Sequence, residues 1–254
     1  MSADDFSPTL FDQTSANIDN PWVAFKPGKR FTWTGSTEED GERVRHRIVF
    51  TVTDMTKVIN GVRTRVGWDR DFSGGKLIES ELIFLAEDKA GNVWHFGQYS
   101  EMWDGPEYLG GQVWLPGRPK GAKAGIYMRA EPRLGSPPYS EGFAPPPYYW
   151  DDWGKIDQVG VRNCVPVGCH NNVVVVDEYE PTKPGAHQLK YYARGVGNIR
   201  TGWRGKDADR EVLVLRKVAQ LNGADVAKAR EAVRQLEDRA FVYASTRRAE
   251  PPTR

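Results

Sequence analysis

Period-two alternation of apolar and polar residues is the feature that most restricts the fold of this chain. From Val44 to Thr53 the even-numbered positions carry most of the apolar residues and the odd-numbered positions carry arginines and threonines. Such alternation is typical of a strand with one buried and one hydrated face. The stretch from Val62 to Phe72 repeats the pattern, and Asn60-Gly61 between them suits the positive φ angles of a type I′ turn. The sequence therefore predicts an antiparallel hairpin here.

Similar segments, separated by Gly- and Pro-containing turn signals, recur along most of the chain. Together with the two above they bring the expected number of strands to about ten. The others are Phe31 to Thr34, Lys76 to Ala86, Asn92 to Met102, Asp157 to Arg162, Val173 to Glu180, His187 to Ala193, Asn198 to Arg204 and Glu211 to Lys217.

Strands with one apolar and one polar face must stack as two sheets or close on themselves, and closure removes exposed edges. We therefore expect a mainly β protein, an antiparallel meander closed into a β-barrel of about 8–10 strands. A barrel of this size is filled by side chains or holds one small ligand.

The pattern changes after the last strand. Asn222 is a helix cap, and apolar residues follow at gaps of three and four from Val226 to Ala240, which predicts one amphipathic C-terminal helix over residues 222–243. This helix is expected to pack across the barrel or plug one end, and a helix that forms a homodimer is the alternative.

Local amino-acid composition predicts the boundaries of the remaining segments. Residues 1–20 are expected to be a flexible segment, 21–217 the barrel domain and 244–254 a mobile tail. The aromatic and proline-rich stretch 137–153 is expected to be a lid over the barrel, or alternatively a structural flap.

Charge and hydropathy exclude several classes of partner. The 254 residues include 35 basic and 34 acidic side chains, for a net charge of +1, which predicts no nucleic-acid partner. No apolar run is long enough for a membrane span. Met1 to Thr14 lacks the basic start and apolar stretch of a secretory signal, so a soluble, cytoplasmic protein is expected.

Three segments carry a more specific likeness: NPWVAFKPGKRFTWTG from Asn20, LAEDKAGNVWHFG from Leu85 and LKYYARGVGNIR from Leu189. Together they resemble a family of mostly uncharacterised bacterial calycin-like (lipocalin-like) β-barrel proteins. His95 and Gln98 stand where that family usually has a tyrosine and an acid. The resemblance implies a scaffold and no reaction, and at fold level the chain is similar to ligand-binding barrels and to cofactor-free cyclases of bacterial natural-product pathways.

Two side chains are candidates for proton transfer. His46 falls among apolar residues on the face assigned to the interior, where an imidazole could exchange protons near neutral pH, and a structural, hydrogen-bonded histidine is the alternative. Tyr191 and Tyr192 split between the two faces, and an inward tyrosine, taken as Tyr191, could orient a carbonyl group.

Rings and one guanidinium are expected to line a hydrophobic site. Arg70 needs a carboxylate partner, either from a ligand or from Glu79 or Glu81, and the internal pair is favoured. Either Trp94 and Phe96 or His95 faces the interior. The expected ligand-binding residues are Phe50, Trp68, Arg70, Phe84, Trp94, Phe96, Tyr149 and Trp150.

No metal or cofactor is expected. The four histidines lie at none of the short spacings of common metal sites, and no phosphate or dinucleotide motif occurs in a suitable context. Cys164 and Cys169 are interpreted as free thiols, in keeping with the cytoplasmic assignment.

The sequence thus predicts a protein that binds a hydrophobic small molecule, such as a lipid, polyene or polyketide-like compound, inside a barrel. The alternative is a cofactor-independent cyclase or isomerase acting on such a molecule in the same cavity. A third interpretation is a structural protein with a solidly packed barrel.

Overall fold

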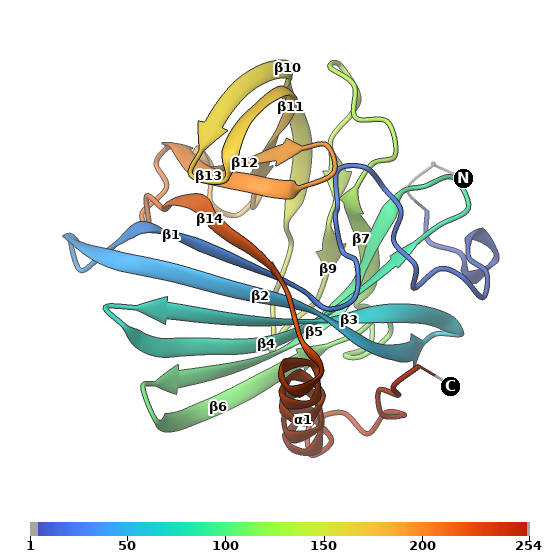
Figure 1. The fold of residues 1–254 in the computed structure, drawn as a ribbon. Helices are drawn as coiled ribbons and strands as arrows, with labels where there is room; N and C mark the ends of the chain where they lie inside the picture. Colours follow the sequence, from blue (N-terminus) through green and yellow to red (C-terminus); the bar gives the residue numbers. More distant parts are fainter. Residues whose placement is uncertain (1–4, 253–254) are drawn as a thin grey trace.

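The computed structural model describes residues 5–252, and most of them form one antiparallel sheet of 14 strands (Figure 1). Residues 1–4 and 253–254, the ends of the segments expected to be flexible, lie outside the described residues. No helix in the described part of the chain is long and apolar enough to cross a membrane. The elements are η1 (Pro8–Leu10), β1 (Lys29–Glu39), β2 (Glu42–Ile59), β3 (Val62–Ser73), β4 (Lys76–Glu87), β5 (Val93–Asp104), β6 (Glu107–Trp114), β7 (Lys123–Met128), β8 (Tyr139–Ser140), β9 (Gly142–Phe143), β10 (Trp153–Val165), β11 (Gly168–Tyr179), β12 (Ala186–Ala193), β13 (Gly197–Gly205), β14 (Val212–Gln220) and α1 (Gly223–Ala240).

The sheet is a meander, but it is not a closed barrel. Its order runs β8-β10-β11-β12-β13-β14-β1-β2-β3-β4-β5-β7-β9, with β6 added beside β5. The two terminal strands of this order, β8 and β9, are separated in sequence by Glu141 alone, so the ends of the sheet meet at that residue without pairing with each other. The expected closure into 8–10 strands is therefore corrected to an open sheet of 14 strands, in which β6 lies off the main path.

The hairpin predicted at Asn60-Gly61 is confirmed. Both residues have positive φ, 48° and 80°, and Ile59 pairs with Val62 across the turn. Because the turn has two residues, even-numbered positions of β2 lie opposite odd-numbered positions of β3, as with Val52 and Gly67. This parity decides which side chains of the two strands share a face.

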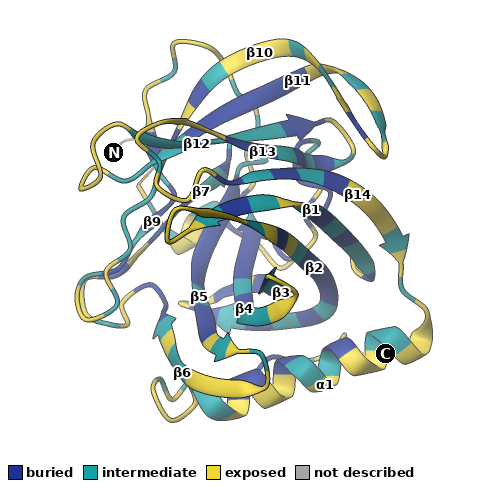
Figure 2. Ribbon diagram, turned by 90° about the vertical axis from the view of Figure 1, so that its left-hand side faces the viewer, coloured by how far each residue is buried: buried dark blue, intermediate teal, exposed yellow. Residues whose placement is uncertain are grey.

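The part of the sheet near α1 has buried side chains on both faces. Ile83 faces the hollow of the sheet, whereas its neighbours Leu82 and Phe84 face outward, and both are buried. Helix α1 lies along this outer side, where Val233 and Leu236 join the same apolar cluster (Figure 2).

Helix α1 confirms the predicted C-terminal helix. Asn222 caps it by accepting a hydrogen bond from the backbone N–H of Asp225. A buried ion pair of 2.7 Å between Lys57 Nζ and Glu237 Oε1 ties it to β2. Beyond the helix the chain is not a free tail up to residue 252, because Glu250 exchanges two backbone hydrogen bonds with Thr56.

The N-terminal segment is also packed onto the sheet. The rings of Phe6 and Phe11 lie 5.3–6.1 Å from those of Trp94 and Phe96, on the outer face of β5. The described part of residues 1–20 therefore covers apolar surface, which the polar composition of this segment did not suggest.

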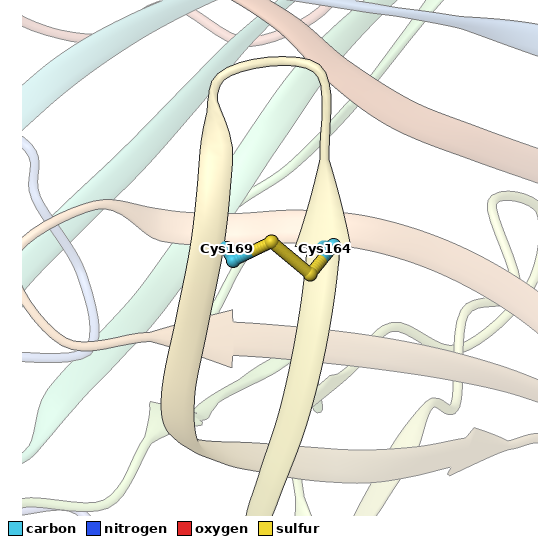
Figure 3. The surroundings of a disulfide bond; sticks show 2 residues. All are labelled: Cys164 and Cys169. Atoms are coloured by element: carbon cyan, nitrogen blue, oxygen red, sulfur yellow. A yellow bond between two sulfur atoms is a disulfide. The ribbon is translucent and has the colours of Figure 1, made fainter.

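Cys164 and Cys169 form a disulfide (Figure 3). They are direct partners in the β10–β11 hairpin, on either side of its turn. The expectation of free thiols was wrong, because the hairpin register brings together two residues that sequence spacing alone could not place.

Candidate functional site

The concave side of the sheet encloses a cavity of about 330 Å³. That volume lies at the lower end of the range for small-molecule sites. Strands β1 to β4, β7 and β12 to β14, the segment before β1 and the turn before β13 supply its walls. The lining residues are Trp22, Val23, Phe25, Phe31, Trp33, Ile48, Phe50, Asp69, Glu81, Ile83, Tyr127, Gln188, Lys190, Tyr192, Val196, Gly197, Asn198, Thr201, Glu211 and Leu213.

One wall of the cavity is aromatic. Phe25 stacks on Phe50 with ring centroids 4.8 Å apart, and Phe31 stacks on Trp33 at 5.7 Å. The indole N–H of Trp33 donates to the carbonyl oxygen of Asn198 at 2.9 Å, so the polar atom of this ring is already paired. Such a wall binds flat or aliphatic groups and also attracts cations through the ring quadrupoles.

The second wall carries two carboxyl groups that face each other across neighbouring strands. Asp69 of β3 and Glu81 of β4 are direct cross-strand partners. Asp69 accepts one hydrogen bond, from the backbone N–H of Arg70 at 2.8 Å. Glu81 makes no hydrogen bond or ion pair with any other described residue, so its carboxyl group is available to whatever occupies the cavity.

Both carboxyl groups bind protons more tightly than usual. Burial, with the charges of Asp71 and Glu79, raises the pKa of Asp69 to about 7. Burial, with the charges of Glu79 and Asp69, raises the pKa of Glu81 well above its ordinary value. The pair therefore holds protons near neutral pH, and a cation bound beside it would release them.

Two other ionised clusters at the cavity are internally compensated. Lys190 Nζ lies 2.5 Å from Glu178 Oε2, and Gln188 donates to Glu211 at 2.9 Å. His46 contacts both Glu211, at 3.0 Å from Nδ1, and Asp71 through Nε2. Asp69 and Glu81 are therefore the carboxyl groups of the cavity lining that form no ion pair with a described residue, although the charge of Lys190 acts on Glu81 from a distance.

His46 is a structural cation in this arrangement. Burial disfavours its charged form, but the hydrogen bonds and charges of Asp71 and Glu211 outweigh burial and raise the pKa of His46 to about 10. It does not line the cavity. An imidazolium held in this way is a poor general base at neutral pH.

The structure places the other predicted site residues in different environments. Phe50 lines the cavity, but Trp68 and Arg70 lie on the opposite face of β3, where Arg70 stacks on Trp68 at 4.1 Å. Of the two tyrosines, Tyr192 lines the cavity and Tyr191 does not; Arg200 lies 5.4 Å from the Tyr191 ring.

The remaining predicted ligand contacts are also elsewhere. Phe84, Trp94 and Phe96 are buried in the cluster that includes residues of α1 and the N-terminal segment. His95 therefore faces the other way, where its ring lies 5.1 Å from those of Trp114 and Trp150. Tyr149 is exposed.

The stretch 137–153 does not cover the cavity. None of its residues lines the space; β8 and β9 within it form the seam at which the sheet ends meet. Trp150 stacks on Trp114 at 5.1 Å, and Gln98 donates to the hydroxyl of Tyr148 at 2.9 Å. The segment Trp22 to Phe25 lies over the cavity instead.

Metal ligation is not indicated by geometry, since no three His, Cys, Asp or Glu side chains converge as a metal site among residues 5–252.

Comparison with known proteins gives weak likenesses only. No family model matches the chain, and no curated protein matches it. A crystal structure of a candidate exported protein with a YmcC-like fold from Bacteroides fragilis NCTC 9343 matches with a TM-score of 0.40 and 11% identity, over 76% of this chain and 96% of that one. A candidate lipoprotein from Parabacteroides distasonis ATCC 8503 matches with a TM-score of 0.41 and 10% identity, over 79% and 99%.

Two sequence-based expectations are corrected by these findings. The expected cytoplasmic location is contradicted by this chain's own cysteines, because they form a disulfide, a bond that persists in oxidising compartments. The calycin-like family is not confirmed, and the part of that resemblance that stands is a large antiparallel β-sheet.

Proposed function

We propose that the protein binds a small amphipathic molecule in the cavity, with an apolar body against the aromatic wall and a basic head beside Asp69 and Glu81. The observation that carries this proposal is the presence of an aromatic wall and of two carboxyl groups without an ion pair among the described residues, around about 330 Å³ of space. A hydrophobic body agrees with the expectation from the sequence. The sequence did not predict the basic head, which follows from the positions of Asp69 and Glu81 in the cavity lining.

A cation is the ligand head that these acids favour most. Both carboxyl groups are half-buried and hold protons near neutral pH, and a bound ammonium group favours their ionised forms by pairing with the negative charge that proton release creates. Neutral hydroxyl groups gain only a hydrogen bond, and a carboxylate is repelled. The cyclase or isomerase alternative is not carried forward, because His46 and Tyr191, the residues expected to move a proton, do not line the cavity.

The location that fits the disulfide is outside the cytoplasm, in an oxidising compartment. A binding role there requires neither a cofactor nor a metal.

Three probes of one shape test the proposal: adamantylmethylamine, adamantylmethanol and adamantanecarboxylate, titrated by calorimetry at pH 8. We expect the amine to bind at least about tenfold more tightly than the alcohol, a difference of about 1.4 kcal/mol, and the carboxylate to bind most weakly. Glu81→Gln should lower the affinity for the amine until it is close to the affinity for the alcohol.

Glu107→Gln is the matched control, because Glu107 is an exposed strand glutamate of β6 that does not line the cavity. It should leave the order of the probes unchanged. Equal affinities for the three probes, or an amine preference that survives Glu81→Gln, would contradict the basic head; absence of binding by all three would contradict the cavity as a ligand site.

A further inference from the structure

A second feature of the sheet lies on its outer face, away from the cavity. Arg43, Arg45 and Arg47 of β2 alternate with His46 and Ile48, and Ile48 lines the cavity. The three guanidinium groups therefore project from the opposite face. With Arg216 of β14 they border a groove of about 640 Å³, whose floor includes Thr34 and Ser36 of β1.

The arginines of this groove have no carboxylate partners. None of Arg43, Arg45, Arg47 and Arg216 forms an ion pair with a described residue. Glu38, the cross-strand partner of Arg43, contacts Arg210 instead. Arg30 and Arg70 flank the groove and are equally unpaired, and the charges of Arg30 and Arg47 act on Arg70 from nearby.

Neutral groups hold several of these side chains in place. Arg43 Nε donates to Ser36 at 2.7 Å, and Arg216 Nε donates to Thr34 at 3.2 Å. Arg47 lies over the Phe72 ring at 4.0 Å. Each guanidinium is thus oriented without loss of its charge, and the outer N–H groups of Arg43 and Arg216 make no hydrogen bond with described residues.

Oriented, unneutralised guanidinium groups match phosphate or sulfate, which they bind through two parallel hydrogen bonds. Alternate residues of a strand are about 7 Å apart, so the three arginines of β2 form a row of about 13 Å. A row in a groove fits an extended ligand with repeated anionic groups better than a single ion.

The surroundings distinguish between possible polyanions. Single-stranded nucleic acid needs free aromatic faces for its bases, but the rings here, Phe72 and Trp68, are covered by Arg47 and Arg70. A bilayer surface is usually engaged with exposed apolar side chains as well, and no groove residue is a large exposed apolar one.

We infer that this groove binds a linear polymer that carries phosphate or sulfate groups and no bases, such as an acidic glycan. The groove and the cavity lie on opposite faces of β2. A negative result for ligand binding in the cavity therefore leaves the groove proposal unaffected, and the reverse also holds.

The test is a calorimetric titration of the full chain with a heparin-derived hexasaccharide at low and moderate salt. We expect binding that weakens steeply with salt, and a loss of at least tenfold in affinity in the Arg45→Gln/Arg216→Gln double variant. Arg63→Gln is the matched control, an exposed strand arginine held by the hydroxyl of Thr56 outside the groove, and it should bind as the wild type does. Both variants should unfold at the same urea concentration as the wild type, which reports an intact fold without reference to the cavity.

Three results would overturn the inference. The first is no binding of the hexasaccharide, or binding that the double variant retains. The second is tighter binding of a twelve-residue oligothymidylate, about the length of one single-strand site, which would assign the groove to nucleic acid. The third is sedimentation with phosphatidylglycerol-containing vesicles that depends on Arg45 and Arg216 while the hexasaccharide does not bind, which would assign it to a membrane.

Discussion

His46 shows how two residues distant in sequence fix the role of a third. It falls on the inner face of β2, as the alternation predicted, but Asp71 and Glu211 reach it from β3 and from the residue before β14. No local pattern reveals that convergence, since the partners lie 25 and 165 positions away. The imidazole therefore links β2 to β3 and to the start of β14, and it is not available to a ligand.

The raised pKa of His46 has a consequence for stability. A cation whose pKa rises from 6.5 to about 10 on folding contributes stability that is complete below pH 6.5 and is lost as the pH approaches 10. We expect His46→Gln to lower the free energy of unfolding by about 3–5 kcal/mol at pH 6, because Asp71 and Glu211 lose their partner. Urea unfolding at pH 6 and at pH 10 measures this; a variant deficit that is the same at both values would show that His46 is not the cation we describe.

At the level of elements, alternation predicted the strands well and their shared faces poorly. The β2–β3 hairpin and α1 follow from Asn60-Gly61 and from the cap at Asn222. The expected ligand residue Trp68 was assigned to the face of Phe50, but a two-residue turn pairs positions of opposite parity, so Asp69 shares that face instead. The turn signal could have revealed this. Apolar periodicity misled because β4 has apolar residues on both faces, with Ile83 at the cavity wall and Leu82 and Phe84 in the cluster that includes residues of α1.

The way in which the two ends of the sheet meet could not be predicted from the same signals. The seam consists of two strands of two residues each, around Glu141, which are too short to show any alternation. The cavity's cover was missed for a related reason: the segment from Trp22 to Phe25 has no regular structure, and its rings are placed by contacts with strands far along the chain.

This cover segment can be tested apart from the carboxyl groups. Phe25→Ala removes the ring that stacks on Phe50. We expect the affinities of adamantylmethylamine and adamantylmethanol to fall together, by about tenfold, because each loses the same apolar contact area. Calorimetry on the two probes measures this. A fall for one probe alone would mean that Phe25 does not act as a common apolar wall.

For the molecule as a whole, the net charge of +1 conceals a separation of acidic from basic side chains across one sheet. Strands β3 and β4 turn Asp69 and Glu81 into the cavity, while β2 and β14 present arginines on the outer face. Composition predicted no nucleic-acid partner because acidic and basic side chains cancel in the net charge. Only the strand register, which sends neighbouring residues to opposite faces, makes the separation visible.

The enclosed carboxyl pair is the centre of the functional proposal, and proton release on binding tests it most directly. Near pH 7 the empty cavity holds protons on Asp69 and Glu81, so an ammonium group that binds there must displace them. Calorimetric titration of adamantylmethylamine at pH 7, in two buffers of different ionisation enthalpy, counts the protons released. We expect net release with the amine, none with adamantylmethanol, and an amine affinity that rises from pH 6 to pH 8. Amine binding without proton release, or with an affinity independent of pH, would contradict the proposal.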